Sequence, residues 1–389
     1  MRCSSKRSAG AAALLLAIAA AAATDAGARE GESRRPAPVL LRPEAARVAI
    51  LPVVNLSGDE APLGAFQQWL IDELQRRRIP LLDDMALRAF MRRNRMRDMG
   101  GPSREMARAL REETGASAVL VSSIDLYDES IPPRFAMTSR LVSAGDDPRI
   151  LWMGSADRVG DEAPGFLALG EIDNRIAVQR IVLDRIVGSL VGYLRTPSGG
   201  EGAMAGVERA RERHAPRTFY RAEGIVPPRS GRARVAVLPF ANGSTTRRAA
   251  EILTLHLIRH LVTAGAAEIV EPGIVRQALL QQRIIQEHGL SVPQADLVRQ
   301  LLSADVALFG EVTEYRETGA GTVEPQVEFS VRAIDTASRQ VVWSSDSYGE
   351  GDDRVFFFAA GRIPTAHRLA DRMTAALVEK ILPSLEGPP

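Results

Sequence analysis

Two histidines of the chain stand at a spacing that can hold a metal ion. His256 and His260 are four residues apart in a stretch with a helical apolar pattern, so both side chains would lie on one helix face. The zinc-protease motif needs a Glu after the first His, and Leu257 stands there instead. Because apolar residues flank both histidines, packed or helix-boundary side chains are favoured over metal ligands. The other histidines share no such spacing and are expected to be isolated surface residues: His214, His288 and His367.

Other catalytic patterns are missing from the sequence. The only cysteine is Cys3, and there is no Gly-x-Ser-x-Gly segment, so the common nucleophilic sites have no nucleophile. The turns Asn55–Ser57 and Asn242–Ser244 follow apolar strand patterns, where backbone N–H groups could hold an anion. A turn that caps the next helix is favoured instead, with Ser244 or Thr245 as the second N-cap. We therefore expect no enzyme, no cofactor and no metal.

Two segments are candidates for a surface that binds a protein partner. Arg88, Arg92 and Arg95 make one predicted helix basic, and Phe90 is its only aromatic residue. A solvated face or a docking face for an acidic partner is favoured over a nucleic-acid site, which needs interleaved aromatics. For the second segment, insertion into the core and exposure as a partner or membrane patch are both open. It is the aromatic run after the last predicted strand: Phe356, Phe357 and Phe358.

The first 28 residues are typical of a signal peptide. Basic residues precede the apolar run Ala11–Ala23, and the small residues Ala26–Ala28 predict cleavage after Ala28. The run has 13 residues, fewer than the roughly 20 of a membrane-spanning helix, and no later run is as long. Because no Cys follows it, we expect no lipid anchor. The richness in Arg and Ala is typical of a GC-rich bacterial genome, so the expected location is the periplasm, with outer-membrane association left open.

The chain contains an internal repeat, which determines the predicted fold. The segments Arg47–Ser57 and Arg234–Ser244 share seven identities in eleven aligned positions. About 70 residues later, Gly115–Val121 aligns with Ser303–Phe309, and the offset between aligned segments changes only from 187 to 191. Two copies of one domain therefore account for the length of 389 residues.

The pattern of each copy predicts the same series of elements, βαβααβββα. The three consecutive strands form a meander, and one last helix closes the copy. In copy one we expect a helix marked by Phe66, Leu70 and Leu74, strand Ile79–Leu82, helices Asp84–Asp98 and Ser103–Thr114, strands Ala118–Leu126, Phe135–Val142 and Ile150–Ala156, and a closing helix marked by Ile172–Leu190. In copy two we expect helix Thr246–Ala264, strand Ala267–Val270, helices Gly273–Glu287 and Pro293–Leu302, strands Val306–Glu314, Gln326–Ile334 and Val341–Ser347, and a closing helix marked by Leu369–Ile381.

The predicted class is α/β, with two tandem domains that are each a mixed sheet packed with helices. The boundaries are a signal peptide at 1–28, a flexible arm at 29–45, copy one at 46–195, a linker at 196–230 and copy two at 231–385.

These segments resemble a bacterial cell-envelope domain. The residues that carry the resemblance are Val235–Phe240 with the following Asn-x-Ser turn, Ala304–Val312 and the hairpin Arg332–Trp343. The domain is shared by the curli secretion channel subunit family, the outer-membrane activators of penicillin-binding proteins and the N-terminal domain of the Tol translocation protein. The resemblance implies binding to other envelope proteins or assembly into rings, without catalytic residues. The long membrane hairpins of the curli group and the lipid-bearing Cys of many members are missing here.

The expected function is that of a non-enzymatic, secreted envelope protein. It would be a tandem-domain binding or scaffold module for a periplasmic or outer-membrane protein assembly, with an envelope protein as its partner. The alternative is a ring-forming accessory subunit of a secretion or export apparatus, which would be a homo-oligomer. The 49 basic and 48 acidic residues nearly cancel, so the net charge of +1 gives no general attraction to nucleic acid.

Overall fold

The computed structural model describes residues 47–96, 100–161, 171–195, 213–222, 232–283, 292–317, 324–353 and 362–385, which all belong to one compact unit of the chain. It is a mixed α/β structure, which confirms the predicted fold class. The predicted signal peptide at 1–28, the arm at 29–45 and most of the linker at 196–230 lie outside the described residues.

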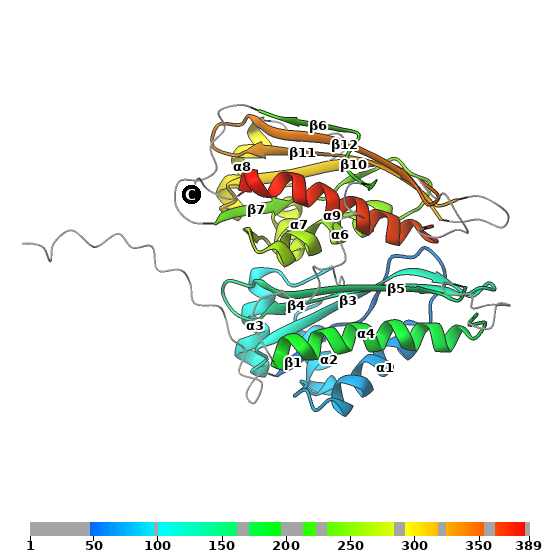
Figure 1. The fold of residues 1–389 in the computed structure, drawn as a ribbon. Helices are drawn as coiled ribbons and strands as arrows, with labels where there is room; N and C mark the ends of the chain where they lie inside the picture. Colours follow the sequence, from blue (N-terminus) through cyan, green and yellow to red (C-terminus); the bar gives the residue numbers. More distant parts are fainter. Residues whose placement is uncertain are drawn as a thin grey trace, which may run out of the picture. The chain divides into compact units, whose positions relative to one another are not determined.

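The first half of the chain forms a five-stranded mixed sheet (Figure 1). Its strands are β1 (Val48–Ile50), β2 (Val54–Asn55), β3 (Ala118–Asp128), β4 (Arg134–Ser143) and β5 (Ile150–Val159). β1 and β2 pair in parallel with β3, and β3, β4 and β5 form an antiparallel meander. The helices of this half are α1 (Leu63–Arg76), α2 (Asp84–Arg93), α3 (Arg104–Thr114) and α4 (Arg175–Arg195).

The second half forms a seven-stranded sheet with the same central pattern. Its strands are β6 (Thr218–Arg221), β7 (Ala233–Val237), β8 (Ala241–Asn242), β9 (Ala267–Ile269), β10 (Val306–Arg316), β11 (Gln326–Asp335) and β12 (Val341–Glu350). β7 and β8 pair in parallel with β10, and β10 to β12 form the meander. Its helices are α6 (Ala249–Ala264), α7 (Pro272–Gln281), α8 (Val292–Leu302) and α9 (Ala366–Leu385).

The two sheets share their registers and irregularities. The first strand of each meander pairs at equivalent points, Val48 with Ala118 and Val235 with Val306. A register shift follows at Ile124/Leu126 in β3 and at Val312/Glu314 in β10. A second shift occurs at the far end of both sheets, at Leu141/Val142 and Ala333/Ile334. Positions in one half can therefore be matched with positions in the other from the hydrogen-bonding pattern.

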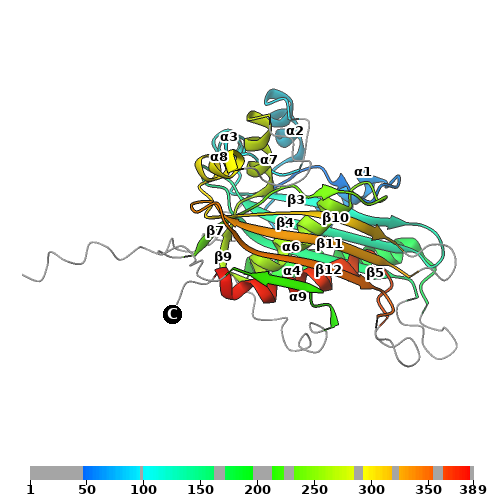
Figure 2. The same ribbon diagram turned by 90° about the horizontal axis from the view of Figure 1, so that it is seen from above.

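Each sheet packs one face against a pair of long helices. In the first half α1 and α4 cover β3 to β5, and the Phe66 ring stacks on Phe135 at 4.8 Å between centroids. In the second half α6 and α9 cover β10 to β12 around Trp343. The shorter helices pack near the start of the meander, α2 and α3 in one half and α7 and α8 in the other (Figure 2).

The other face of the first sheet is also covered. Nearly every residue of β3 and β4 is buried, whereas β11 alternates between buried and more exposed residues. The difference arises because α6 of the second half contacts β5, and Met153 of β5 belongs to the apolar core of the second half. The first sheet therefore lies between its own helices and those of the second half (Figure 1).

The structure differs from the predicted elements at several places. The predicted strand Ile79–Leu82 is reduced to a single bridge between Leu81 and Val48. The predicted helix Asp84–Asp98 ends at Arg93, because Arg95 takes a left-handed φ of 50° that an α-helix excludes. Similarly, the helix predicted to reach Glu287 ends at Gln281, with Arg283 at a φ of 54°. Finally, a strand, β6, occupies Thr218–Arg221 within the predicted linker and pairs with β12.

The predicted caps at the Asn-x-Ser turns are wrong for both halves. Helix α1 begins after Pro62, without a side-chain cap. Helix α6 begins after Arg248, without a side-chain cap. Ser244 instead donates its hydroxyl to Asn242 Oδ1 at 2.8 Å, and Asn242 donates to the backbone oxygens of Thr246 and Arg247. The side chains close the turn on itself, as an Asx-type turn does, so they do not reach the helix.

Candidate functional site

The predicted basic face lies on α2. Asp83 caps this helix by accepting the backbone N–H of Ala86 at 3.0 Å, and Leu87 and Phe90 fix its inner face in the core. Arg92 is in the last turn, where a positive charge interacts favourably with the helix dipole. The amphipathic pattern therefore sets the arginines on the outer face.

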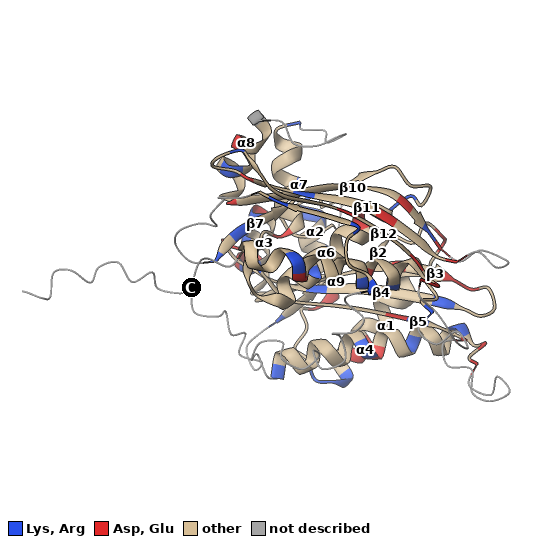
Figure 3. Ribbon diagram, turned by 45° about the horizontal axis from the view of Figure 1, so that its top comes forward, with Lys and Arg blue, Asp and Glu red and all other residues tan. Residues whose placement is uncertain are grey.

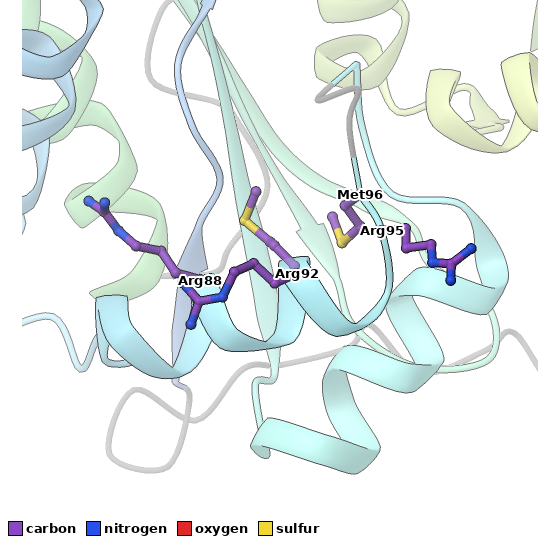
Figure 4. Close-up of a pocket in the computed structure, with 5 residues that line it drawn as sticks. Arg88, Arg92, Arg95 and Met96 are labelled. Atoms are coloured by element: carbon purple, nitrogen blue, oxygen red, sulfur yellow. The ribbon is translucent and has the colours of Figure 1, made fainter.

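The structure brings the predicted site residues Arg88, Arg92 and Arg95 together around a shallow pocket of about 500 Å³ (Figure 4). The rest of its lining is Met91 and Met96, which are half-buried and pack on the core beneath α2. Exposed cations thus surround a floor of flexible thioether side chains. Sequence analysis predicted the arginines, but the methionine floor was missed because its residues look like ordinary core positions.

The arginines differ in their partners. Arg88 donates its Nε to Asp84 Oδ2 at 2.6 Å across one helical turn. Arg93, outside the pocket, pairs with Glu113 of α3 at 2.7 Å, and this hydrogen bond lowers the pKa of Glu113. Within the described residues, Arg92 and Arg95 have no ion-pair partner and are exposed. They are the two cations best placed to meet an acidic group of another molecule.

The other predicted site residues, Phe356, Phe357 and Phe358, lie outside the described residues, as does His288. Whether this aromatic run is inserted or exposed stays a prediction.

His367, which was predicted to be an isolated surface residue, forms one buried group with His256. His256 on α6 is packed against His367 at the start of α9, with ring centroids 4.4 Å apart. His367 Nε2 lies 3.3 Å from Asp125 Oδ2 on the first sheet, and both side chains are at most 2% exposed. The expectation that His367 is a surface residue is wrong, because the first sheet covers the start of α9. His214 is also buried.

The carboxylate of Asp371 on α9 lies close to both His256 and His260. Asp371 Oδ1 lies 2.9 Å from His256 Nδ1, without hydrogen-bond geometry, and 3.1 Å from His260 Nε2, and it also pairs with Arg259. Burial alone would raise the pKa of Asp371, but Arg259 and the histidines hold it well below its usual range. The described residues contain no cluster of three or more His, Cys, Asp or Glu arranged to hold a metal ion.

The pKa values of the two stacked histidines shift in opposite directions, because Asp125 contacts only His367. Burial, with a smaller effect of the His367 charge, lowers the pKa of His256 from 6.5 to about 4. Burial would also lower the pKa of His367, but the hydrogen bond and charge of Asp125 outweigh it, so this pKa is raised. Near neutral pH, His256 is therefore a neutral packing residue, whereas Asp125 favours the charged form of His367 across the contact between the two halves.

A second buried charge pair joins the halves. Arg140 of β4 donates two nitrogens to Glu271, with Nη2 to Oε1 at 2.8 Å and Nε to both oxygens at 3.1 and 3.2 Å. Their side chains are 6% and 0% exposed. Glu271 is also the N-cap residue of α7. Two residues further along the chain, Gly273 packs against the backbone of Gly101 in the first half. Neither charged residue was singled out from the sequence, because a charge within a strand or at the start of a helix is typical of a solvent-exposed position.

A larger cavity, of about 620 Å³, lies where the two halves meet. Both halves line it, with Leu56 and Arg140 from the first and Phe240 and Arg248 from the second. Of its arginines, Arg140 is held by Glu271 and Arg248 by Glu251.

No protein-family model and no curated protein matches the chain. Solved structures similar to parts of it include the PelC dodecamer from Paraburkholderia phytofirmans, with a TM-score of 0.27, 23% identity, and coverage of 41% of this chain and 96% of that one. Lipoprotein GNA1162 from Neisseria meningitidis has a TM-score of 0.28 and 16% identity, with 39% and 99% covered. The LpoB C-terminal domain from Salmonella enterica has a TM-score of 0.25 and 15% identity, with 33% and 87% covered.

With TM-scores below 0.5, these similarities assign neither a family nor a function to this chain. The predicted resemblance to the activators of penicillin-binding proteins stays a prediction. The resemblances to the curli channel subunit and to the Tol protein stay predictions. Within the described part of the chain, no helix has the length and apolar character needed to cross a membrane.

Proposed function

We propose that the protein is a non-enzymatic, exported envelope protein that acts as a binding or scaffold module. Its two halves are tandem copies of one domain, and it serves a protein assembly in the periplasm or at the outer membrane. The matched strand registers and register shifts of the two sheets support the duplication, because independent domains have no reason to share them.

The observation that carries the proposal is the pocket on α2. Exposed Arg92 and Arg95 beside Met91 and Met96 offer charge and adaptable apolar surface within one shallow site. A matching partner segment has an acidic group for the arginines and an apolar side chain for the methionines. Complementary charges across such a contact increase specificity and the association rate more than they increase affinity.

The second half supplies a natural comparison. The equivalent helix α7 also has ten residues, and its C-cap Gln282 corresponds to Asn94 of α2. At the position of Arg92 it has Leu280, which is 65% exposed. Arg276 and Arg283 correspond to Arg88 and Arg95, so the second half lacks only the middle arginine and the full set of three belongs to the first half. If the pocket binds the partner, the two helices have different roles.

In-cell crosslinking tests the proposal. A photoreactive amino acid in place of Arg92 in the full-length protein should capture one discrete envelope protein, and the same amino acid in place of Leu280 should not. The charge reversal Arg95→Glu, with the photoreactive group kept at position 92, should reduce the capture about tenfold or more. The matched reversal Arg283→Glu on α7 should leave it unchanged.

Equal capture from positions 92 and 280, or capture that survives Arg95→Glu, would show that the α2 pocket is not the docking site. Sequencing the N-terminus of the mature protein from the same cells checks the proposed export. A chain that starts at Arg29 fits it, and a chain that retains the first 28 residues in the cytoplasm would contradict it.

A further inference from the structure

The contact between the two halves is a head-to-tail contact. The second half contributes the start of its helices α7 and α9, through Glu271 and His367, and the first half contributes the open face of its sheet, through Arg140 and Asp125. Two similar bodies thus touch through different surfaces. Such a heterologous contact leaves one surface of each kind unused, one on each body.

The unused helix surface lies on the first half. Leu82 donates its backbone N–H to Val48, as Val270 does to Val235, so Asp83 occupies the position of Glu271. Both residues are N-caps, of α2 and α7. Glu271 is fully buried against Arg140, whereas Asp83 is exposed.

The unused sheet surface lies on the second half. Arg140 pairs with Val121 and Met153 across the first sheet, and Arg332 pairs with Phe309 and Ser344 at the matching points of the second. Arg332 therefore occupies the position of Arg140, and it is exposed. The acid and the base of the buried pair both recur in the chain, on opposite unused surfaces.

Two exposed apolar side chains of the first half coincide with buried contact positions of the second. Ile176 is 43% exposed, and it matches His367, because Ile172 and Ile363 make the same backbone hydrogen bond four residues earlier. Met85 is 78% exposed and occupies the position of Gly273. A contact that repeats the one between the halves would bury both side chains.

The charge of α4 is complementary to that of the strands β10 to β12. The charged residues of α4 are four arginines and one aspartate, all exposed: Arg175, Arg180, Asp184, Arg185 and Arg195. β10 to β12 carry six acidic residues against two arginines: Glu311, Glu314, Arg316, Glu328, Arg332, Asp335, Asp346 and Glu350. Figure 3 shows the blue positions along α4 and the red ones on the strands.

We infer that the partner of both unused surfaces is a second copy of this chain. The open face of β10 to β12 of one molecule packs on α1, α4 and the start of α2 of the next, so that Arg332 pairs with Asp83 of the neighbouring molecule. The contact between molecules thus repeats the contact between the halves. The inference goes beyond the proposed function. Arg92 and Arg95 match Leu280 and Arg283, which stay exposed, whereas Arg88 matches Arg276, which lies against Gly100 of the first half. Only the Arg88 side of the pocket would therefore meet the neighbouring molecule.

Light scattering of the mature protein over a range of concentrations tests this contact. The wild-type protein should form dimers or longer assemblies. Asp83→Asn keeps the helix cap but removes the charge, and should weaken self-association about tenfold or more. Arg332→Glu and Asp83→Arg should each abolish assembly, because each places like charges opposite one another. Mixing these two variants should restore it, since every junction then pairs opposite charges.

A wild-type protein that stays monomeric at about 100 µM, well above the micromolar range of weak specific interfaces, would overturn the inference. Assembly of Arg332→Glu at the wild-type concentration would do so too, as would a mixture that stays monomeric. Circular dichroism and thermal melting of each variant show whether it is folded. Loss of assembly here with normal crosslinking from position 92 separates this contact from the proposed function.

Discussion

Arg140 and Glu271 show how the fold uses charge inside its junction. A guanidinium with three nitrogen–oxygen contacts to one carboxylate is well paired, yet both groups gave up hydration when the halves packed. The pair therefore selects one arrangement of the halves more than it adds net stability. The sequence could not predict it, because the partners are 131 residues apart and neither pattern marks a junction.

Removing one partner of this pair should be costly. Glu271→Ala leaves Arg140 charged and buried, and should lower the free energy of unfolding by about 3–5 kcal/mol. The double change Arg140→Met with Glu271→Leu should cost much less, since no buried charge remains. Urea denaturation of dilute protein measures both. The matched control is Arg332→Ala, at the exposed equivalent position, which should change stability by less than about 0.5 kcal/mol. A cost of Glu271→Ala no larger than this control would contradict the buried pairing.

The stacked histidines predict a pH dependence of stability. The pKa of His256 is about 4 in the folded chain and about 6.5 unfolded, so between these values only the unfolded chain gains the proton. Stability should therefore fall as the pH drops from 6.5 to 5, by about 2 kcal/mol from this group. His256→Gln should lack this part of the dependence, as measured by urea denaturation at both pH values. An identical slope in both proteins would show that His256 is not held neutral.

His367 acts in the opposite direction. Its pKa is raised in the folded chain, so its contribution is complete below pH 6.5 and is lost as the pH rises through the folded value. Well below pH 6.5, His367 is protonated in both the folded and the unfolded chain. Of these two histidines, only His256 therefore contributes to the loss of stability toward pH 5.

At the scale of elements, periodicity predicted most of the fold. The meander strands β3 to β5 and β10 to β12 appear where the alternating and apolar patterns place them, each extended by one to three residues. Helix ends were less predictable: α2 ends at Arg93 because Arg95 turns left-handed, and nothing in its residue type announces that turn. β6 was missed because its stability comes from pairing with β12, and Thr218–Arg221 has no clear pattern of its own.

The start of α7 is pressed against the first half, which gives a prediction for Gly273. A Cβ added there would lie 2.5 Å from the carbonyl carbon and oxygen of Gly101, which are backbone atoms that cannot rotate away. Gly273→Ala should cost about 1–3 kcal/mol in urea denaturation. Gly188→Ala in α4 is the matched control, because nothing lies within 4 Å of its Cβ position, and it should stabilise by about 0.5–1 kcal/mol. Equal effects at the two positions would show that α7 does not touch Gly101.

At the scale of the whole molecule, the repeat predicted two similar bodies but not their arrangement. The residues that join them, such as Asp125 with His367 and Asp157 with Arg368, are more than 200 positions apart and belong to no motif. The predicted basic face of α2 depends on spacing along one helix, so three of its arginines could be recognised. The pocket beneath them required the packing of Met91 and Met96, which only the folded chain displays.

The central claim is that this molecule works by docking an envelope protein on α2. The most direct measurement is the yield of the protein crosslinked from position 92 in living cells, in chains that carry Arg95→Glu or Arg283→Glu. We expect one captured envelope protein, strongly reduced by Arg95→Glu and unaffected by Arg283→Glu. No discrete captured protein, or equal loss with both reversals, would contradict it.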